Sequence, residues 1–210
     1  MAVRALDGWN HNIHYHPELL RAVPRPCLRA LDAGCGLGAF ARRLARVAAV
    51  VDAIDRDAVV VARARELSAG TPNLRLTHAD FLTWPESSYD FVSLVATLHH
   101  LPFVEALTKA ASLLRPNGVL AVLGLHRNAS VFDLAPNVVV FPVSLCRRLV
   151  HGASEVGAPT RDPTMTLTEI RTEAAAALPG AVFRRHLLWR YSVIWSKGPD
   201  RLESRCPGSP

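Results

Sequence analysis

The chain has 210 residues, a length that suits one compact domain and leaves little room for a second. Half of the residues are hydrophobic, which is enough for a packed core, but no apolar run reaches the roughly 18 residues of a membrane-spanning helix. The net charge of +6 comes almost entirely from arginines spread along the whole chain, which does not favour a nucleic-acid-binding stripe.

The cysteines argue against a disulfide framework and against a zinc site. They lie far apart and have no CxxC spacing, a pattern that suits a reducing compartment. Residues 1–10 also lack the apolar stretch of a signal peptide. We therefore expect a cytoplasmic location and no bound metal. The four cysteines are Cys27, Cys35, Cys146 and Cys206.

Strands and helices are predicted to alternate along most of the chain. Residues 1–27 are polar and rich in histidine and proline, which indicates an N-terminal cap with one short helix. Alternation of this kind is typical of a parallel sheet built from βαβ units. Apolar runs predict strands at 28–33, 50–54, 74–77, 90–96 and 119–125, with two more within 181–197. Helical spacing and helix-boundary signals predict helices at 40–47, 57–67, 104–114 and 168–177.

Two segments interrupt the alternation. Residues 126–164 contain four prolines and an apolar stretch at 138–150, and the segment is too long for an ordinary connection. We expect a lid over the carboxyl edge of the sheet, with packing on the sheet edge or a dimer contact as the alternative. Residues 198–210, rich in proline and glycine, are expected to form a flexible tail.

A glycine-rich turn follows the first predicted strand and precedes a helix. Glycines let the backbone approach a ligand closely, and the start of a helix offers N–H groups to an anion. The turn alone suits an adenosylmethionine cofactor or a dinucleotide, and a tight turn that binds no ligand can have the same sequence pattern. We assign cofactor contacts to Asp32, Ala33, Gly34, Cys35, Gly36 and Gly38.

Asp55 ends the second predicted strand, where an acidic side chain accepts hydrogen bonds from ribose hydroxyls. Capping of the next helix is the alternative role, but Asp57 is better placed for it. A ribose contact at Asp55 suits S-adenosylmethionine and NAD equally.

Further motifs follow in register, and with them residues 28–125 resemble the class I S-adenosylmethionine-dependent methyltransferase family. In that family an aspartate after the third strand accepts from the adenine amine and its neighbour packs on the ring, which Asp80 and Phe81 match. Arg56 departs from the family, which often has an apolar residue there, and its side chain would cover the adenine instead. The other matching segments are Tyr89-Asp90-Phe91-Val92, Leu98-His99-His100-Leu101 and Leu114-Arg115-Pro116-Asn117-Gly118, in which Asn117 replaces the commoner glycine.

The resemblance implies an α/β fold, Rossmann-like, with a seven-stranded sheet in the order 3-2-1-4-5-7-6, strand 7 antiparallel, and helices on both faces. It also implies S-adenosylmethionine as cofactor and a methyltransferase domain at 28–197. The expected reaction is methyl transfer to an oxygen, nitrogen or carbon nucleophile of a partly apolar small molecule, in the setting of secondary metabolism. Ala96, at the end of the fourth strand, and Tyr15, from the N-terminal cap, are further expected cofactor contacts.

Three histidines are candidates for a general base. His99 and His100 follow the fourth strand and His126 follows the fifth, at the carboxyl edge where ligands bind in such sheets. The alternative is that these histidines only order their loops, which for His126 is the favoured interpretation. A base is needed for a hydroxyl or an acidic carbon, but not for a neutral amine.

A second histidine cluster lies near the N-terminus and has three interpretations. Metal binding is the least favoured because no cysteine or carboxylate completes the set. A lid over the methionine end of the cofactor and plain surface histidines are equally supported. The cluster comprises His11, His14 and His16.

Other functions remain as alternatives. Methylation of RNA or protein is the first alternative. Enzymes that methylate the amino groups of bases often carry an Asn/Asp-Pro-Pro-aromatic motif after the fourth strand, and its absence at 96–99 disfavours a base as the acceptor. An NAD-dependent oxidoreductase is disfavoured by Asp80 and Phe81 and by the lack of a Tyr-x-x-x-Lys pair. A cofactor-binding homologue without catalytic activity would retain the same glycines and acids.

Overall fold

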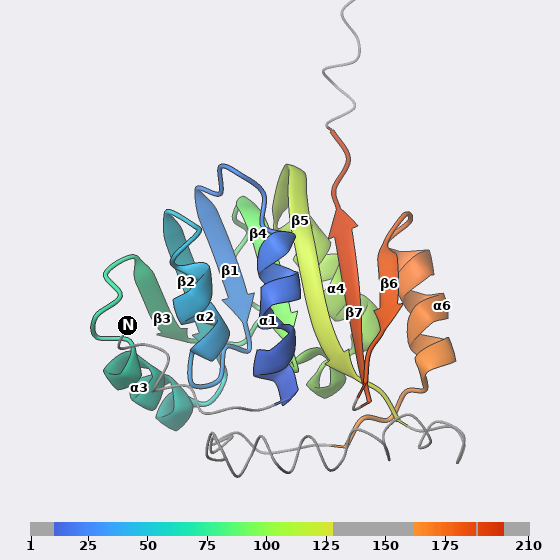
Figure 1. The fold of residues 1–210 in the computed structure, drawn as a ribbon, viewed down its shortest axis with the longest axis horizontal. Helices are drawn as coiled ribbons and strands as arrows, with labels where there is room; N and C mark the ends of the chain where they lie inside the picture. The colour runs from blue at the N-terminus through green and yellow to red at the C-terminus, as the bar shows by residue number, and fades with distance from the viewer. Residues whose placement is uncertain (1–10, 128–161, 188, 200–210) are drawn as a thin grey trace, which may run out of the picture.

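A computed structural model describes residues 11–127, 162–187 and 189–199. Its centre is a seven-stranded sheet with the order β3-β2-β1-β4-β5-β7-β6 (Figure 1). The strands are β1 (Arg29–Ala33), β2 (Val50–Asp55), β3 (Leu74–His78), β4 (Tyr89–Val95), β5 (Leu114–Leu125), β6 (Val182–Arg185) and β7 (Arg190–Ser196).

The predicted fold class is confirmed. The pairs β2–β3, β1–β2, β1–β4 and β4–β5 are parallel, whereas β7 runs antiparallel to both β5 and β6. The sheet order reverses between β1 and β4, so the carboxyl ends of these two strands flank the crevice in which such sheets bind ligands. The topology alone therefore directs attention to the loops after β1 and β4.

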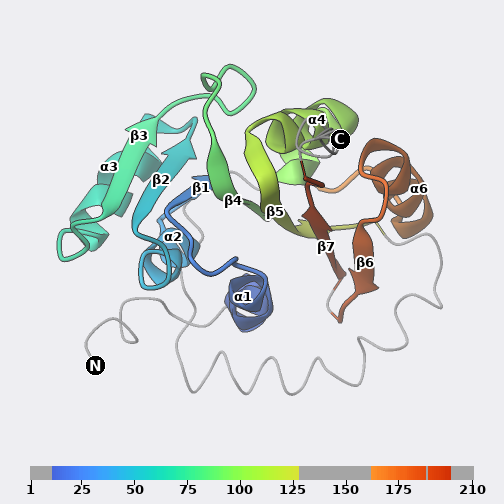
Figure 2. The ribbon, with the colours of Figure 1, turned by 90° about the horizontal axis from the view of Figure 1, so that it is seen from above.

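Helices cover both faces of the sheet, and each face has its own hydrophobic core (Figure 2). On one face α1 (His11–Arg21) and α2 (Ala39–Leu44) pack through Leu19, Phe40 and Leu44. On the other face α4 (Phe103–Ser112) and α6 (Leu167–Ala177) pack through residues such as Leu107 and Ile170. Successive strand residues supply the two cores alternately, as the period of two in a strand requires.

Helix α3 (Ala58–Leu67) packs beside β2 and β3 and begins as the sequence predicts. The Asp57 carboxylate accepts from the N–H groups of Val59 and Val60, so it satisfies two donors that the first turn of a helix leaves open. Asp57 is therefore the helix cap, and Asp55 is left for another role.

Element boundaries differ from the sequence prediction in three places. Helix α2 ends at Leu44 rather than at Val47, because the chain must already turn to pair Ala49 N–H with Cys27 O. Helix α6 starts earlier, since Thr166 and Glu169 form a reciprocal capping box. Strand β5 begins at Leu114, so the predicted turn that contains Asn117 lies inside the strand as a bulge.

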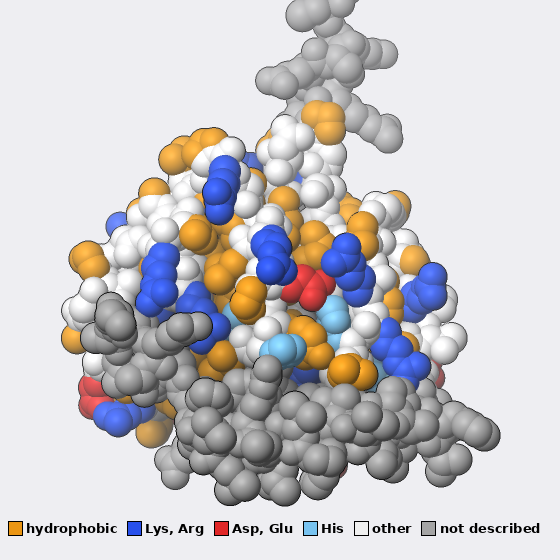
Figure 3. All heavy atoms as spheres, viewed as in Figure 1, with side chains coloured by type: hydrophobic (Ala, Val, Ile, Leu, Met, Phe, Trp, Pro, Cys, Tyr) orange, Lys and Arg blue, Asp and Glu red, His pale blue; other side chains and the backbone are white. Residues whose placement is uncertain are grey.

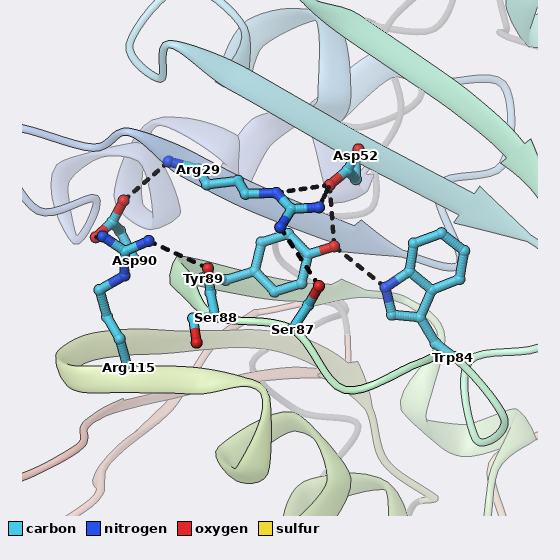
Figure 4. Close-up of polar contacts among 8 residues, drawn as sticks. All are labelled: Arg29, Asp52, Trp84, Ser87, Ser88, Tyr89, Asp90 and Arg115. Carbon is cyan, nitrogen blue, oxygen red and sulfur yellow. Dashed lines mark hydrogen bonds and ion pairs between the residues drawn. The ribbon is translucent and has the colours of Figure 1, made fainter.

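A polar network lies near the amino ends of β1, β2 and β4, away from the crevice (Figure 4). The Asp52 carboxylate accepts from Tyr89 Oη at 2.9 Å and pairs with Arg29 at 2.9 Å. Trp84 Nε1 donates to Tyr89 Oη at 3.1 Å and ties down the β3–β4 connection, which has no helix. The Asp90 carboxylate accepts the N–H groups at the start of β1 and pairs with Arg115. These contacts join β1, β2, β4 and β5.

Several sequence-based expectations fall outside the described part of the chain. Residues 128–161 of the proposed lid, residues 1–10 of the cap and residues 200–210 of the tail are among them. Within the described ranges, no helix is both long enough and apolar enough to cross a membrane.

Candidate active site

The loop between β1 and α2 forms the floor of the candidate site. Gly34, Gly36 and Gly38 have φ values of +70°, +53° and +77°, a backbone region that favours glycine. A Cβ placed on Gly36 would meet no atom within 4 Å among the described residues, so the loop faces open space there. A ligand can thus approach the backbone at Gly36 without displacing a side chain.

Asp32 and Ala33 lie beneath this loop. Asp32 is 1% exposed, and its Oδ1 accepts from Ser93 Oγ at 2.8 Å, while no described group bonds the buried Oδ2. Burial raises the pKa of Asp32 to about 7, although the Ser93 bond opposes that rise. Both residues were expected to contact a cofactor, but their burial favours support of the loop instead.

The end of the loop is held by Arg42 of α2. Its Nη1 donates to Leu37 O at 2.7 Å and to Ser68 Oγ at 3.2 Å. Gly38 is buried against this guanidinium, so it packs on protein rather than facing open space. Burial raises the pKa of the Cys35 thiol strongly, which keeps it protonated and suits neither metal binding nor nucleophilic attack.

Asp55 connects the end of β2 to the glycine loop. Its Oδ2 accepts from Gly36 N–H at 2.9 Å, and its Oδ1 accepts from Asp57 N–H at 3.0 Å. The carboxylate is partly exposed, and each oxygen retains a further lone pair for a ribose hydroxyl. The neighbouring Arg56 is exposed, so its side chain is accessible to a ligand at this edge.

The adenine motif splits into an exposed and a buried residue. The Asp80 side chain is exposed, and its Oδ1 accepts from Leu82 N–H at 2.8 Å, which shapes the turn after β3. The Phe81 ring is 5% exposed and belongs to the hydrophobic core. The expected packing of this ring on adenine stays a prediction, and the burial leaves only a small part of the residue accessible to a ligand.

The chain after β4 bends sharply toward the glycine loop. Ala96 has φ +55° and is followed by Thr97 and a 3₁₀ turn at Leu98–His100, which we call the histidine turn. The rings of His99 and His100 lie with their centroids 4.0 Å apart. Burial, together with the charges of His100 and Arg190, lowers the pKa of His99 to about 4. His99 is therefore neutral at pH 7 and able to accept a proton, though it is a weak base.

His126 occupies a different environment from the other two candidate bases. Its ring is 3% exposed, and Nδ1 lies 3.2 Å from Arg127 O, an acceptor that requires the proton on Nδ1. Its backbone N–H donates to Trp189 O at 3.1 Å. These contacts favour an ordering role at the end of β5 over proton transfer.

Helix α1 and β7 bring together residues that the sequence motifs do not reveal. Arg190 is 8% exposed, and its Nε donates to Asn12 Oδ1 at 2.8 Å. Tyr15 Oη donates to Leu187 O at 3.3 Å, and the Tyr15 ring packs on His186 with centroids 4.6 Å apart. Asn12 and Arg190 are separated by 178 positions, so no local pattern predicts their contact. The expected cofactor contact of Tyr15 stays a prediction.

The N-terminal histidines do not form one group. His16 is 2% exposed and packs edge-on against Phe40, whereas His14 is exposed. Within 11–127, 162–187 and 189–199, no three metal-ligating side chains are grouped so that they could hold an ion. Burial and the nearby Arg43 charge lower the pKa of His16 to about 3, so this ring is a neutral core residue.

The site fits an adenosyl cofactor. Open space at Gly36, a partly exposed carboxylate at Asp55 and an exposed acceptor at Asp80 follow one another along the carboxyl ends of β1, β2 and β3. The fold and this row of groups define an α/β protein that binds a nucleoside cofactor.

Comparisons with known proteins identify the family. A family model described as a methyltransferase domain matches residues 31–122. An uncharacterised methyltransferase of Mycobacterium tuberculosis is 38% identical over 191 residues, which cover 89% of this chain and 96% of the relative. The chain belongs to the class I S-adenosylmethionine-dependent methyltransferase family, and it is an enzyme that uses S-adenosylmethionine as its cofactor.

More distant relatives share part of the sequence or only the fold. A ubiquinone biosynthesis O-methyltransferase of Methylocella silvestris is 36% identical over 131 residues, which cover 58% of this chain and 51% of that protein. The crystal structure of the N-methyltransferase NodS from Bradyrhizobium japonicum with S-adenosyl-L-homocysteine has a TM-score of 0.60 at 19% identity and covers 88% of this chain and 86% of that one. This second likeness concerns the fold alone.

Proposed function

We propose that this methyltransferase acts on a partly apolar small molecule through an oxygen, nitrogen or carbon nucleophile. The observation that carries the proposal is the pairing, across one crevice, of the open glycine loop with the neutral His99 ring, whose centroid lies 4.0 Å from that of His100. Known methyltransferases of similar sequence or fold include an O-methyltransferase of ubiquinone biosynthesis and an N-methyltransferase crystallised with S-adenosylhomocysteine.

Each residue of the crevice has a proposed task. Gly36 allows close approach of the cofactor to the backbone, Asp55 accepts from the ribose hydroxyls, and Asp80 accepts from the adenine amine. Arg56 covers the adenine in place of the apolar residue common in the family. When bound, S-adenosylmethionine would supply a methyl group on a sulfonium, and the neutral thioether that remains after transfer is a good leaving group. The protein's remaining task is to align the acceptor and exclude water.

His99 is the proposed base where the acceptor is a hydroxyl or an acidic carbon. A ring with a pKa of about 4 is neutral at pH 7, so one of its two nitrogens carries a proton and the other is available to accept one. A neutral amine would need no base, and His99 would then only shape the pocket. Tyr15 is the proposed contact from α1, because that helix runs along one face of the sheet and begins near the carboxyl end of β1 (Figure 1).

Methylation of RNA or protein is the alternative function. On the face that carries α1 and α2, Lys and Arg side chains are scattered among uncharged surface and form no single stripe (Figure 3). This distribution supports a small acceptor over a nucleic acid. The free thiols of Cys27 and Cys35 support the further proposal of a cytoplasmic location.

A transfer assay tests the proposal. The protein is incubated with tritiated-methyl S-adenosylmethionine and an extract of the source cells, and the label is then separated by size and by extraction into organic solvent. We expect label in the small, solvent-extractable fraction. The Gly36→Val variant, which fills the open space at the loop, is the control and should give background counts. Label that RNase or protease releases from large material would contradict a small acceptor.

A further inference from the structure

Thr97 contacts the glycine loop across a long stretch of sequence. Its Oγ1 lies 3.1 Å from Gly34 O, a residue 63 positions away, and 3.1 Å from Val95 O. One hydroxyl carries one proton, so these two carbonyls share a single donor. The contact with Gly34 joins the loop after β4 to the loop after β1.

The two residues also fit each other closely. A Cβ on Gly34 would lie 2.3 Å from both Cγ2 and Oγ1 of Thr97, which is far shorter than any real contact. Thr97 therefore occupies the space that a side chain at position 34 would need. The position of the glycine loop depends on the shape of Thr97 as well as on its hydrogen bond.

The backbone of Thr97 begins the histidine turn. Its carbonyl accepts from His100 N–H at 2.9 Å, and the preceding Ala96 N–H donates to Leu123 O at 2.7 Å. The bend at Ala96, with φ +55°, aims the chain back toward β1. One residue thus touches the cofactor loop with its side chain and the histidine turn with its main chain.

We propose that Thr97 is a positioning residue that couples the glycine loop to the histidine turn. A state that fixes the conformation of the glycine loop then also favours a fixed conformation of the histidine turn. The converse holds as well, because such coupling is reciprocal by thermodynamic necessity. A bound cofactor steadies Gly34, and through Thr97 it steadies the turn that presents His99 and His100. The assignment of that turn to the acceptor side rests on the proposed function.

The test compares two substitutions by calorimetry with S-adenosylhomocysteine and by hydrogen exchange of the His100 amide. Thr97→Val keeps the shape and removes the hydroxyl, whereas Thr97→Ser keeps the hydroxyl. In the wild type we expect saturating S-adenosylhomocysteine to slow His100 exchange at least about threefold. Thr97→Val should weaken binding about three- to tenfold, the effect of one lost hydrogen bond, and abolish that slowing. Thr97→Ser should stay within about twofold of the wild type on both measures.

The control is Ser112→Ala, which also removes a hydroxyl that donates to a backbone carbonyl, Lys109 O, but at the end of α4. It should change neither measure. If Thr97→Val does not fold, Thr97→Ala removes the same hydroxyl without new bulk and takes its place.

The outcomes separate the coupling from the proposed function. The coupling is overturned if Thr97→Val binds S-adenosylhomocysteine like the wild type and its His100 exchange is slowed to the same extent. A variant that only melts at a lower temperature, with both measures unchanged, would overturn it as well. If the wild type also methylates a small acceptor, the proposed function stands while the coupling fails. A wild type that binds no S-adenosylhomocysteine would overturn both.

Discussion

The two halves of the sheet's carboxyl edge differ in charge and in construction. Over β1, β2 and β3 lie the three acidic residues Asp32, Asp55 and Asp80, with Arg56 and His78 beside them. Over β4, β5 and β7 lie the basic residues His99, His100, His126 and Arg190. The acidic half is built from short segments that each follow a strand, whereas the basic half needs α1 and the β6–β7 hairpin to meet.

This difference explains why sequence motifs identify cofactor-binding residues better than residues of the acceptor pocket. Acceptors for ribose and adenine must sit at fixed places in the βα units, so they appear as motifs that recur in order. An acceptor pocket has no such constraint, and its walls come from whatever covers the sheet edge. Substitutions in the acidic half, and at His16 where α1 packs on the sheet, test this difference, and the largest expected effect comes first.

Gly34→Ala should have the largest effect. The new Cβ would overlap Thr97 and the residue would be held at φ +70°, so we expect a loss of about 3 kcal/mol or more in unfolding free energy. Gly180→Ala is the matched control, because Gly180 has φ +82° but open space around its Cβ, and should cost only about 1 kcal/mol. Urea denaturation measures both. Equal losses in the two variants would refute the close fit of Gly34 against Thr97.

His16→Phe should change the response of stability to acid. The pKa of His16 is lowered to about 3 in the folded state, so between pH 6.5 and 3 the unfolded chain binds the extra proton. Folding stability therefore falls as the pH falls through this window, by up to about 1.4 kcal/mol per pH unit from this residue. Phe cannot titrate and retains the ring packing against Phe40, so it should remove that part of the slope.

The pH dependence of wild-type stability also contains a contribution from Asp32, opposite in sign to that of His16. The raised pKa of Asp32 lets the folded state hold a proton up to about pH 7, which stabilises the protein at lower pH. This contribution is the same in both proteins and cancels in the difference between them. His78→Phe, at an exposed histidine, is the control, and an equal change in slope for both variants would argue against a buried, neutral His16.

Asp55→Ala should have a smaller effect, which concerns the affinity for the cofactor and not the stability of the fold. Loss of a charged acceptor should weaken S-adenosylhomocysteine binding by about 1–3 kcal/mol, because both the ribose contact and the support of Gly36 N–H are lost. Asp57→Ala is the control, since it removes the cap of α3 and should lower stability by about 1 kcal/mol without changing affinity. Calorimetry and thermal melting distinguish the two. Wild-type affinity in Asp55→Ala would remove Asp55 from the site.

Much of the fold was predictable from sequence, and part of the site was not. The strand order and the antiparallel β7 follow from the family resemblance, and the cap at Asp57 follows from the helix-start signal. The burial of Asp32 and Phe81 was not predictable, because a motif fixes a residue's place along the chain and not the depth at which its side chain packs. Contacts such as Thr97 with Gly34 and Asn12 with Arg190 join distant positions and leave no local pattern.

The most direct test of the central claim is calorimetry of the wild-type chain with S-adenosylhomocysteine and, separately, with NADH. Both ligands contain an adenosine that Asp55 and Asp80 could bind, so the glycine loop must distinguish the homocysteine part of one from the pyrophosphate of the other. We predict that S-adenosylhomocysteine binds with a stoichiometry of about one per chain, as expected for a single crevice at the switch of strand order, and that NADH gives no binding heat. Binding of NADH without binding of S-adenosylhomocysteine would contradict the account.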